Sequence, residues 1–258
     1  MKFSVFLPPK AKTFSQTNKQ LPLVYYLGGI ETDVHHLTND TGFQQYATKL
    51  NLIVVGPDTS PRGLDLSSDC KYVGEGASWY VNATEPTWRE NYQMFTYITE
   101  ELPEVIRTNF PVADTAKAGI MGHSMGGHGA LLAALKRPDL YKSVSALAPV
   151  ANIGNPKLSV VKALVEYLGT EPSVWKDWNP SDLIKTYDGK YFKILIDQGT
   201  DDRHHNTLQV WKLMKYSFNK NLTINIRMRQ GYDHGNSFIK TYIGDHLEHH
   251  AKILYMSD

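Results

Sequence analysis

Residues 118–127 read Ala-Gly-Ile-Met-Gly-His-Ser-Met-Gly-Gly, an apolar run that ends in Gly-x-Ser-x-Gly and continues into small helix-forming residues. This order predicts a buried strand, a sharp turn and a helix, with Ser124 on the strained turn and its hydroxyl projecting at the edge of a sheet. Gly122 and Gly126 flank the serine because a Cβ at either position would collide with neighbouring backbone in so tight a turn. The stretch therefore predicts a nucleophilic serine at a strand-to-helix turn.

A serine hydroxyl becomes an effective nucleophile when a base accepts its proton and an acid orients that base. Residues 191–196 have the pattern of a buried strand and run into the polar segment 197–202, Asp-Gln-Gly-Thr-Asp-Asp. Residues 222–228 alternate between apolar and polar, which is typical of a strand with one solvent-exposed face. His234 follows this strand. Because the carboxyl ends of parallel strands share one edge of a sheet, we expect an acid and His234 beside Ser124.

Three carboxylates compete for the position beside the histidine. Asp197 ends the first of these strands, where an aspartate often caps a turn through its side chain. Asp201 and Asp202 lie beyond the next glycine, where a loop can carry a carboxylate back toward the imidazole. Spacing alone does not separate these two aspartates.

Other histidines have more ordinary interpretations. His246, His249 and His250 fall on one helical face at i, i+3 and i+4, a spacing that could bind zinc. No cysteine accompanies them, so we interpret the three as a solvated helix end. The chain is expected to hold neither a metal nor an organic cofactor.

Strand and helix patterns alternate along the chain, which predicts a single α/β domain over residues 1–258. Apolar strands favour a mostly parallel central sheet with helices on both faces, entered by one or more antiparallel edge strands. The predicted strands are Lys2–Leu7, Leu21–Leu27, Leu52–Val55, Ala116–Met121, Ser143–Leu147, Phe192–Ile196 and Leu222–Met228. The predicted helices are Gly42–Leu50, Asn91–Asn109, Met125–Lys136, Ser159–Tyr167, Asn206–Asn219 and Ser237–Lys252. The polar region between residues 57 and 90 is interpreted as an active-site loop.

Composition and charge narrow the class of protein. With 27 basic and 26 acidic residues, the net charge of +1 gives no electrostatic reason to expect nucleic acid or an anionic membrane as a partner. No apolar stretch approaches the ~20 residues that span a bilayer, and the first residues lack the pattern of a signal peptide. The single cysteine, Cys70, excludes internal disulfides and suits a reducing compartment, so a cytoplasmic enzyme is expected.

Further stretches of this chain match the sequence pattern of one known family, and they do so in the same order along the chain. They include residues 6–10 (Phe-Leu-Pro-Pro-Lys), 58–63 (Asp-Thr-Ser-Pro-Arg-Gly), 80–84 (Tyr-Val-Asn-Ala-Thr), 109–112 (Asn-Phe-Pro-Val), 122–131, 197–199, 231–234 and 249–252. Through these stretches nearly the whole chain resembles S-formylglutathione hydrolase, also called esterase D, a family of serine hydrolases with the α/β-hydrolase fold. The resemblance implies hydrolysis of a small thioester or ester through an acyl-enzyme, and it is compatible with a homodimer.

The resemblance also implies roles for individual residues. In the family pattern Asp-Gln-Gly-x-x-Asp the second acid belongs to the triad, which places Asp202 with Ser124 and His234. His234 would accept the proton of Ser124, and Asp202 would fix the tautomer of the imidazole. The backbone N–H groups of Ile30 and Met125 would hold the oxyanion, and no cofactor or metal would take part.

Departures from the family pattern gather around the acyl and thiol pockets. Residues 27–32 read Leu-Gly-Gly-Ile-Glu-Thr where the family has Leu-Ser-Gly-Leu-Thr-Cys, so Thr32 replaces a cysteine. Residues 155–159 stand in place of a Cys-Pro-Trp-Gly stretch, and Arg203 replaces an aromatic residue after the triad acid. Trp79 stands where phenylalanine is common, and its larger ring is expected to keep the acyl pocket short, unless it is a core aromatic that faces away.

These departures concern the identity of the substrate, because they lie around the pockets and leave the residues of the triad unchanged. A general short-chain carboxylesterase with little activity on glutathione thioesters is the alternative among enzymes. A non-catalytic binding module on the same fold is the alternative of another class. Met1 aligns inside the usual family chain, so we expect a leading segment to be absent: either the protein starts late or its start was assigned at an internal methionine.

Overall fold

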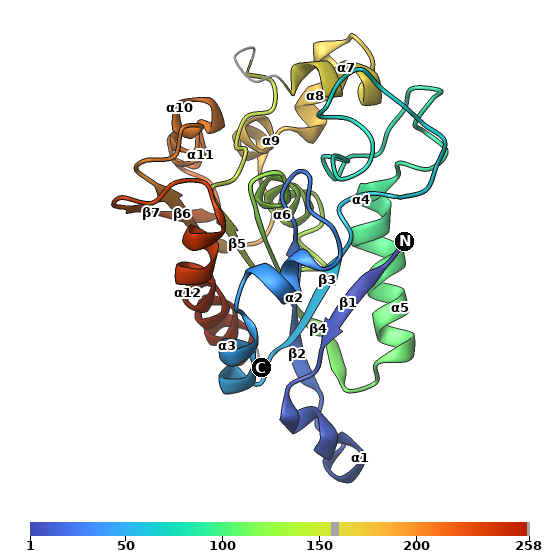
Figure 1. Cartoon of the computed structure of the whole chain (residues 1–258). Coiled ribbons are helices and arrows are strands. Elements are labelled where there is room, and N and C mark those ends of the chain that lie inside the picture. The colour runs from blue at the N-terminus through green and yellow to red at the C-terminus, as the bar shows by residue number, and fades with distance from the viewer. Residues whose placement is uncertain (156–159, 257–258) are drawn as a thin grey trace.

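The structure, a computed structural model, describes residues 1–155 and 160–256. Its centre is a seven-stranded sheet with the strand order β1-β3-β2-β4-β5-β6-β7 (Figure 1). Neighbouring strands are parallel except β1 and β3, which are antiparallel, so the predicted antiparallel edge strand is present. The strands are β1 (Phe3–Phe6), β2 (Leu21–Leu27), β3 (Ile53–Pro57), β4 (Ala113–His123), β5 (Ser143–Leu147), β6 (Phe192–Gly199) and β7 (Leu222–Arg229).

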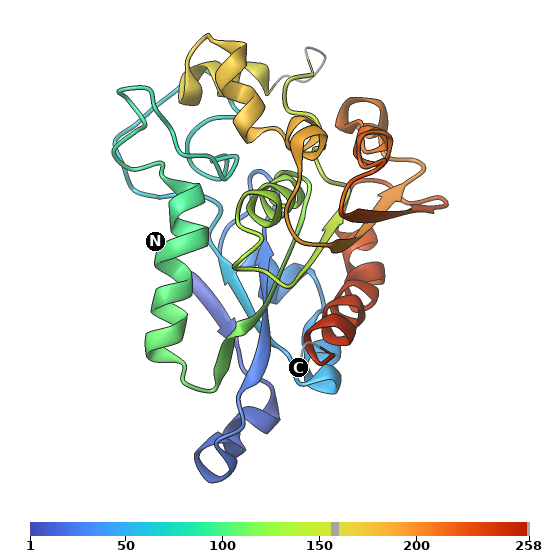
Figure 2. The same ribbon diagram turned by 180° about the vertical axis from the view of Figure 1, so that it is seen from behind.

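Helices cover both faces of the sheet, as Figures 1 and 2 show. α3 (Gln44–Leu50) and α12 (Asn236–Leu254) pack together on one face, and α5 (Leu102–Asn109) and α6 (Met125–Lys136) lie on the other. The predicted α/β class, with a mostly parallel sheet between helical layers, is confirmed. The remaining helices are η1 (Pro9–Thr13), α1 (Phe14–Thr17), α2 (His36–Asp40), α4 (Met94–Thr96), η2 (Tyr97–Glu101), α7 (Val161–Leu168), α8 (Pro172–Trp175), η3 (Lys176–Trp178), α9 (Pro180–Thr186), α10 (His205–Leu208) and α11 (Trp211–Tyr216). Within the two described ranges, no helix has the length and apolar character needed to cross a membrane.

The central strands are buried because helices cover both of their faces and most of their side chains are apolar. All residues of β2, β3 and β5 are buried, and so is the second half of β4. α6 is buried along nearly its whole length, which its small residues permit: a Cβ on Gly129 would collide with the ring of Tyr80. β7 lies at the edge of the sheet, and its side chains alternate in exposure at the start of the strand, as the sequence pattern predicts.

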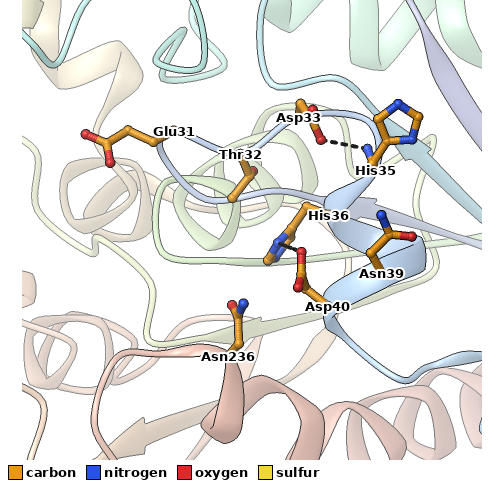
Figure 3. Close-up of a pocket in the computed structure, with 8 residues that line it drawn as sticks. All are labelled: Glu31, Thr32, Asp33, His35, His36, Asn39, Asp40 and Asn236. Atoms are coloured by element: carbon orange, nitrogen blue, oxygen red, sulfur yellow. Dashed lines mark hydrogen bonds and ion pairs between the residues drawn. The ribbon is translucent and has the colours of Figure 1, made fainter.

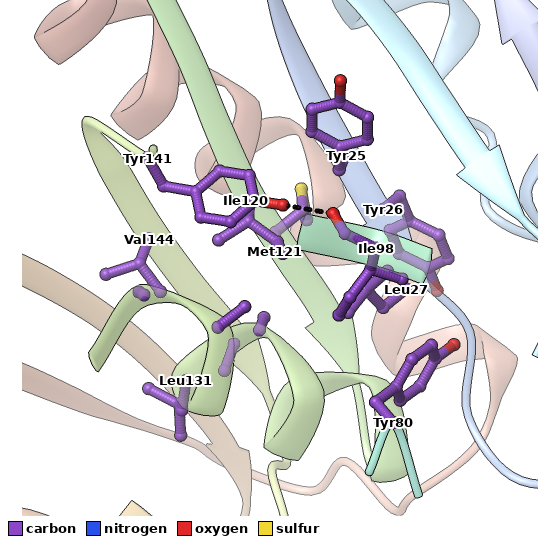
Figure 4. Packing of buried hydrophobic residues seen from close by; sticks show 14 of the residues in the cluster. Tyr25, Tyr26, Leu27, Tyr80, Ile98, Ile120, Met121, Leu131, Tyr141 and Val144 are labelled. Carbon is purple, nitrogen blue, oxygen red and sulfur yellow. Dashed lines mark hydrogen bonds between the residues drawn. The ribbon is translucent and has the colours of Figure 1, made fainter. Parts of the chain in front are cut away.

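Tyrosines fill part of the core between the sheet and the helices, as Figure 4 shows. The rings of Tyr25 and Tyr141 meet edge to face with centroids 5.9 Å apart. Tyr141 OH donates to the carbonyl of Ile98 at 2.7 Å, which ties the loop before β5 to η2. Because its hydroxyl is hydrogen-bonded, this large ring is buried without leaving an unpaired polar atom.

Three predicted helices differ from the observed ones. The helix predicted over residues 91–109 begins only at Met94 and includes the π-helical segment η2. The helix predicted over residues 206–219 is two short helices, because Gln209 adopts a left-handed conformation (φ 56°) that interrupts helical hydrogen bonding. The helix predicted over residues 159–167 is observed as α7, and Ser159 lies outside the described residues.

The segment 58–93, between β3 and α4, lies with α7 and α8 over the sheet edge at which β4 passes into α6 (Figure 1). Aromatic contacts hold it there: Trp88 and Tyr92 pack against Tyr167 of α7, with ring centroids 5.3 and 5.5 Å apart. Tyr167 OH also donates to the carbonyl of Ala77 at 3.0 Å. The segment is therefore held by side-chain contacts over the carboxyl ends of the strands.

Candidate active site

Ser124 lies on a strained turn between β4 and α6. Its φ of 54° and ψ of −116° belong to a region that non-glycine residues rarely adopt. The flanking glycines make the turn sterically accessible: a Cβ on Gly126 would collide with the carbonyl of Leu27, and one on Gly122 with the backbone of Gly126. The Ser124 N–H donates to the carbonyl of Leu147 at 2.9 Å and fixes the turn against β5. The predicted strand, turn and helix are all present.

Three side chains from separate loops form a continuous row of hydrogen bonds. His234 Nε2 lies 2.9 Å from Ser124 Oγ, and His234 Nδ1 lies 2.7 Å from Asp202 Oδ2. Each residue follows the carboxyl end of a strand: Ser124 follows β4, Asp202 follows β6 and His234 follows β7. When the carboxylate accepts a hydrogen bond from Nδ1–H, the lone pair of Nε2 faces the serine hydroxyl, as a general base requires.

Hydrogen bonds hold Asp202 in its ionised form. Burial disfavours the charge, but the hydrogen bond with His234 and further hydrogen bonds outweigh this effect and lower the pKa of Asp202 to about 2. The His204 N–H donates to Oδ1 at 2.7 Å, and Gln198 Nε2 donates to Oδ2 at 2.9 Å. Asp202 is thus a carboxylate at neutral pH.

The two competing acids are engaged elsewhere. Asp201 is exposed, and its carboxylate accepts a hydrogen bond from the neighbouring threonine hydroxyl at 2.8 Å. Asp197 is buried, and the guanidinium groups of Arg227 and Arg229 donate to it at 2.6 to 3.0 Å. Spacing does not choose between Asp201 and Asp202, whereas the geometry places Asp202 against the imidazole.

Two backbone N–H groups near Ser124 have no acceptor. In the part of the chain that the structure describes, neither Ile30 nor Met125 donates its amide hydrogen to another protein atom. Met125 is the first residue of α6, so its N–H lies at the positive end of a helix of 12 residues. Tyr80 OH donates to the carbonyl of Gly28 at 3.1 Å and helps to hold the loop that carries Ile30.

Thr32 braces the same loop. Its hydroxyl donates to the carbonyl of Gly29 at 2.7 Å, and its own carbonyl accepts from Thr59 Oγ1 and, at 2.9 Å, from Arg62 Nη2. Arg62 is in turn paired with the buried carboxylate of Asp58 at 3.0 Å. These contacts give Thr32 a part in shaping the loop in addition to its place in the pocket.

Ser124 opens into a cavity of about 420 Å³. The predicted pocket residues Thr32 and Trp79 both lie on its wall, together with Ile30. Trp79 is only 4% exposed, and its Nε1–H donates to the carbonyl of Tyr72 at 3.0 Å, which fixes the ring. Trp79 therefore borders the cavity that contains the nucleophile candidate and is not a remote core aromatic.

Two further histidines, which sequence reasoning did not place in the site, flank His234. The ring centroid of His123 lies 4.7 Å from that of His234, and the centroid of His204 lies 5.2 Å from it. Burial lowers the pKa of both flanking histidines, and that of His123 falls well below its usual range. Both are neutral at pH 7 and enclose the imidazole without adding charge. His123 occupies a variable position of Gly-x-Ser-x-Gly, so the motif itself carries no signal for it.

A second, polar pocket of about 560 Å³ adjoins this cavity and shares Glu31, Thr32, His36 and Asn236 with it (Figure 3). Its aspartates are engaged: Asp33 Oδ1 accepts from the His35 N–H at 2.8 Å, and Asp40 lies 3.5 Å from His36 Nδ1. Among the described residues, no group of three or more His, Cys, Asp or Glu side chains is placed to hold a metal ion.

Two of the three histidines of α12 belong to the core and His249 is half-buried, so their interpretation as a solvated helix end was wrong. His246 and His250 are fully buried. His250 is hydrogen-bonded to Ser143 Oγ at 2.6 Å and to Ser145 Oγ at 2.9 Å, because α12 packs against β5. The serines of a distant strand supply the partners that make this burial acceptable.

One feature of the sequence, Cys70, does not line the Ser124 cavity, and one departure from the family pattern is not described by the structure. Cys70 has a free thiol and is half-buried. Its backbone N–H donates to Ser68 Oγ at 2.9 Å. Residues 156–159, which make up most of one departure from the family pattern, lie outside the described residues.

Known proteins share this sequence and architecture. The model of the Esterase family matches residues 1–249. The chain is 44% identical to S-formylglutathione hydrolase from Mus musculus and 43% identical to that from Bos taurus, in each case over 98% of this chain and 89% of the relative. This chain belongs to the S-formylglutathione hydrolase family of esterases.

Solved structures agree with this assignment. An S-formylglutathione hydrolase from Agrobacterium tumefaciens matches with a TM-score of 0.90 at 37% identity, over 98% of this chain and 89% of that one. A fluorophosphonate-binding serine hydrolase from Staphylococcus aureus shares the fold, with a TM-score of 0.74 at 21% identity over 96% of this chain and 91% of that one. As a member of this esterase family the chain is an enzyme, which sets aside the non-catalytic binding module.

Asp197→Asn should lower the free energy of unfolding by about 3 kcal/mol, because two arginines lose a buried carboxylate. Burial opposes ionisation of Asp197, but hydrogen bonds from Arg227 and the nearby His246 imidazole, whose Nε2 lies 3.5 Å from Oδ2, lower its pKa to about 2. The stabilising charge is therefore present above the unfolded-state pKa of about 4 and is lost as pH falls toward 2. Urea denaturation at a series of pH values should show the difference between the parent and the variant shrinking below about pH 4.

The matched control for this prediction is Asp201→Asn, at an exposed position in the loop that follows β6, which should change the unfolding free energy by less than about 0.5 kcal/mol. A penalty for Asp197→Asn that stays constant down to about pH 2.5 would contradict the ion-pair explanation.

Proposed function

We propose that this esterase hydrolyses S-formylglutathione to glutathione and formate through an acyl-enzyme on Ser124. The observation that carries the proposal is the row of hydrogen bonds from Asp202 through His234 to Ser124 Oγ. Relatives at 43% and 44% identity that bear the name S-formylglutathione hydrolase support the choice of acyl group and thiol. The single cysteine and a thiol product fit a reducing compartment, and we place the enzyme in the cytoplasm.

In the first half of the reaction, Ser124 Oγ attacks the formyl carbon while its proton passes to His234 Nε2. The Asp202 carboxylate keeps Nδ1 protonated and stabilises the imidazolium. The tetrahedral intermediate collapses as the imidazolium gives its proton to the glutathione sulfur, and the thiol leaves. In the second half, His234 takes a proton from water as the water oxygen attacks the formyl carbon. The imidazolium returns that proton to Ser124 Oγ as the ester bond breaks, and the released formic acid ionises to formate and a solvent proton.

The N–H groups of Ile30 and Met125 are the proposed donors to the oxyanion of each tetrahedral intermediate. Both are free of other acceptors in the described protein, and Met125 adds the positive end of α6. A donor fixed in advance at the developing charge typically contributes about 3 kcal/mol to transition-state stabilisation. These backbone groups would therefore supply a large share of the rate enhancement.

A general short-chain carboxylesterase is the second candidate. Thr32 favours it, because this residue lines the Ser124 cavity and departs from the family pattern. The two candidates share the nucleophile and the base, and they differ in the thiol or alcohol that leaves. The leaving group is therefore what an experiment has to vary.

Comparison of kcat/KM for S-formylglutathione and for p-nitrophenyl formate, which share the acyl group and differ in the leaving group, tests the proposed function. We expect the thioester to be favoured by about 10-fold or more, because its thiol portion would contribute binding energy to the transition state. Steady-state assays of both substrates on one preparation provide the ratio. A clear preference for the nitrophenyl ester would favour the general carboxylesterase.

Ser124→Ala and His234→Ala should each lower kcat by about 10³-fold or more, because the residues of the triad act as one unit. Asp202→Asn should also be severe, since an amide would favour the wrong tautomer of the imidazole. Asp201→Asn is the matched control and should stay within about 2-fold of the parent. Steady-state kinetics, with circular dichroism to verify folding, measures these effects. A crippling Asp201→Asn beside a nearly silent Asp202→Asn would mean that the acid is misassigned.

Trp79 should limit the length of the acyl group. The parent should prefer formyl and acetyl over butyryl substrates, with about a 10-fold fall in kcat/KM for each methylene that does not fit. Trp79→Ala should relax this preference toward longer chains, whereas Trp211→Ala, at a half-exposed position outside the cavity, should not. A series of p-nitrophenyl esters measures both profiles. Equal rates of the parent on acetyl and hexanoyl esters would refute the short pocket.

A further inference from the structure

Three charged side chains line the Ser124 cavity without an oppositely charged partner. They are Lys71 from the segment 58–93, Arg203 from the loop after β6 and Glu31 from the loop after β2. Within residues 1–155 and 160–256, none of the three forms an ion pair with a nitrogen-to-oxygen distance of 4.0 Å or less. Because the protein does not neutralise them, these charges are available to a ligand in the cavity.

Arg203 lies on the side of the cavity formed by the proposed triad. It directly follows Asp202, and its Nε–H donates to His204 Nε2 at 3.1 Å. This hydrogen bond holds the guanidinium near the reacting groups, because the His204 ring lies 5.2 Å from that of His234. The terminal N–H groups of Arg203 have no acceptor in the described protein, and their planar fork matches a carboxylate.

A contact also positions the Lys71 ammonium, and the backbone of Glu31 is fixed. Lys71 Nζ lies 4.8 Å from the ring centroid of Tyr72. Tyr72 is itself held by a hydrogen bond that Trp79 Nε1–H donates to its carbonyl at 3.0 Å. Glu31 has a left-handed backbone (φ 65°), and its N–H donates to the carbonyl of Gly76 at 2.9 Å. Figure 3 shows the Glu31 carboxylate directed away from the histidines and aspartates of the neighbouring polar pocket.

The cavity wall thus presents a permanent positive charge at Lys71 and Arg203 and one negative charge at Glu31. Asp201 and Asp233 line an adjoining hollow with Arg203 but not this cavity. Glutathione carries the opposite pattern at neutral pH, a pair of carboxylates and a single ammonium. We propose that Lys71 and Arg203 bind the carboxylates of the glutathione moiety and that Glu31 binds its ammonium.

This assignment rests on the proposed function and names the residues that recognise the thiol portion of the substrate. Exposed ion pairs each contribute little, so the selectivity should be shared among the three side chains. It should also weaken as salt is added, because counterions screen charges at the mouth of a cavity. Both expectations differ from those for a contact that only supports the fold.

Substrates that share one acyl group but differ in charge provide the test. We use S-acetylglutathione, its N-acetylated derivative, which lacks the ammonium, and S-acetyl-N-acetylcysteamine, which is uncharged. Lys71→Gln and Arg203→Gln should each lower kcat/KM for S-acetylglutathione by about 5-fold, chiefly through KM, and leave the uncharged thioester within about 2-fold. Glu31→Gln should lower kcat/KM for S-acetylglutathione but not for the N-acetylated derivative.

Lys12→Gln is the matched control, because it removes one exposed positive charge from η1, at the end of the molecule away from the cavity (Figure 1). It should leave all three substrates unaffected. Raising the ionic strength from about 20 mM to about 500 mM should bring the parent close to the double variant of Lys71 and Arg203 on S-acetylglutathione. The uncharged thioester should show no such dependence.

The possible failures are distinguishable. If the parent turns over S-acetylglutathione and both glutamine variants match it, the assignment of Lys71 and Arg203 is wrong while the proposed function stands. The assignment is equally wrong if the variants lose activity on all three substrates alike. If the parent turns over only the uncharged thioester, the proposed function itself fails, and this inference fails with it.

Discussion

The strained backbone of Ser124, with a φ of 54° and a ψ of −116°, is the constraint on which the rest of the site depends. Such a backbone typically stores about 1–3 kcal/mol of strain, so the surrounding structure must hold it. It is held by the hydrogen bond to the Leu147 carbonyl and by the close approach of Gly126 to the backbone of Leu27. Because β4 lies between β2 and β5, both contacts come from paired neighbours in the sheet. The hydroxyl of Ser124 and the first N–H of α6 therefore leave the sheet at fixed positions.

The next two strands bring the acid and the base to the same edge. β6 and β7 are parallel neighbours, and their following loops touch where a Cβ on Gly199 would collide with the carbonyl of Tyr232. Of the acids on and after β6, Asp197 is neutralised by Arg227, whereas Asp202 faces the imidazole. Two buried carboxylates a few residues apart thus have different partners, one stabilising the sheet and the other orienting His234.

Much of the fold could be predicted from the sequence because it depends on local patterns. Apolar runs and the Gly-x-Ser-x-Gly turn are sufficient to place the strands and Ser124. The choice between Asp201 and Asp202 could not be made in this way, since adjacent loop residues differ only in the direction their side chains take; the family pattern and the geometry agree on Asp202. The burial of His250 depends on serines about a hundred residues away, and the break at Gln209 on one backbone angle. Neither leaves a periodic signal in the sequence.

The central claim is that His234 activates Ser124 Oγ as the nucleophile. Labelling the intact enzyme with a fluorophosphonate, followed by mass spectrometry of its peptides, tests this claim most directly, because the reagent forms a covalent bond only with an activated hydroxyl. We predict a single adduct on Ser124 and a loss of nearly all labelling in His234→Ala. An adduct on a different side chain, or undiminished labelling of Ser124 in His234→Ala, would contradict the claim.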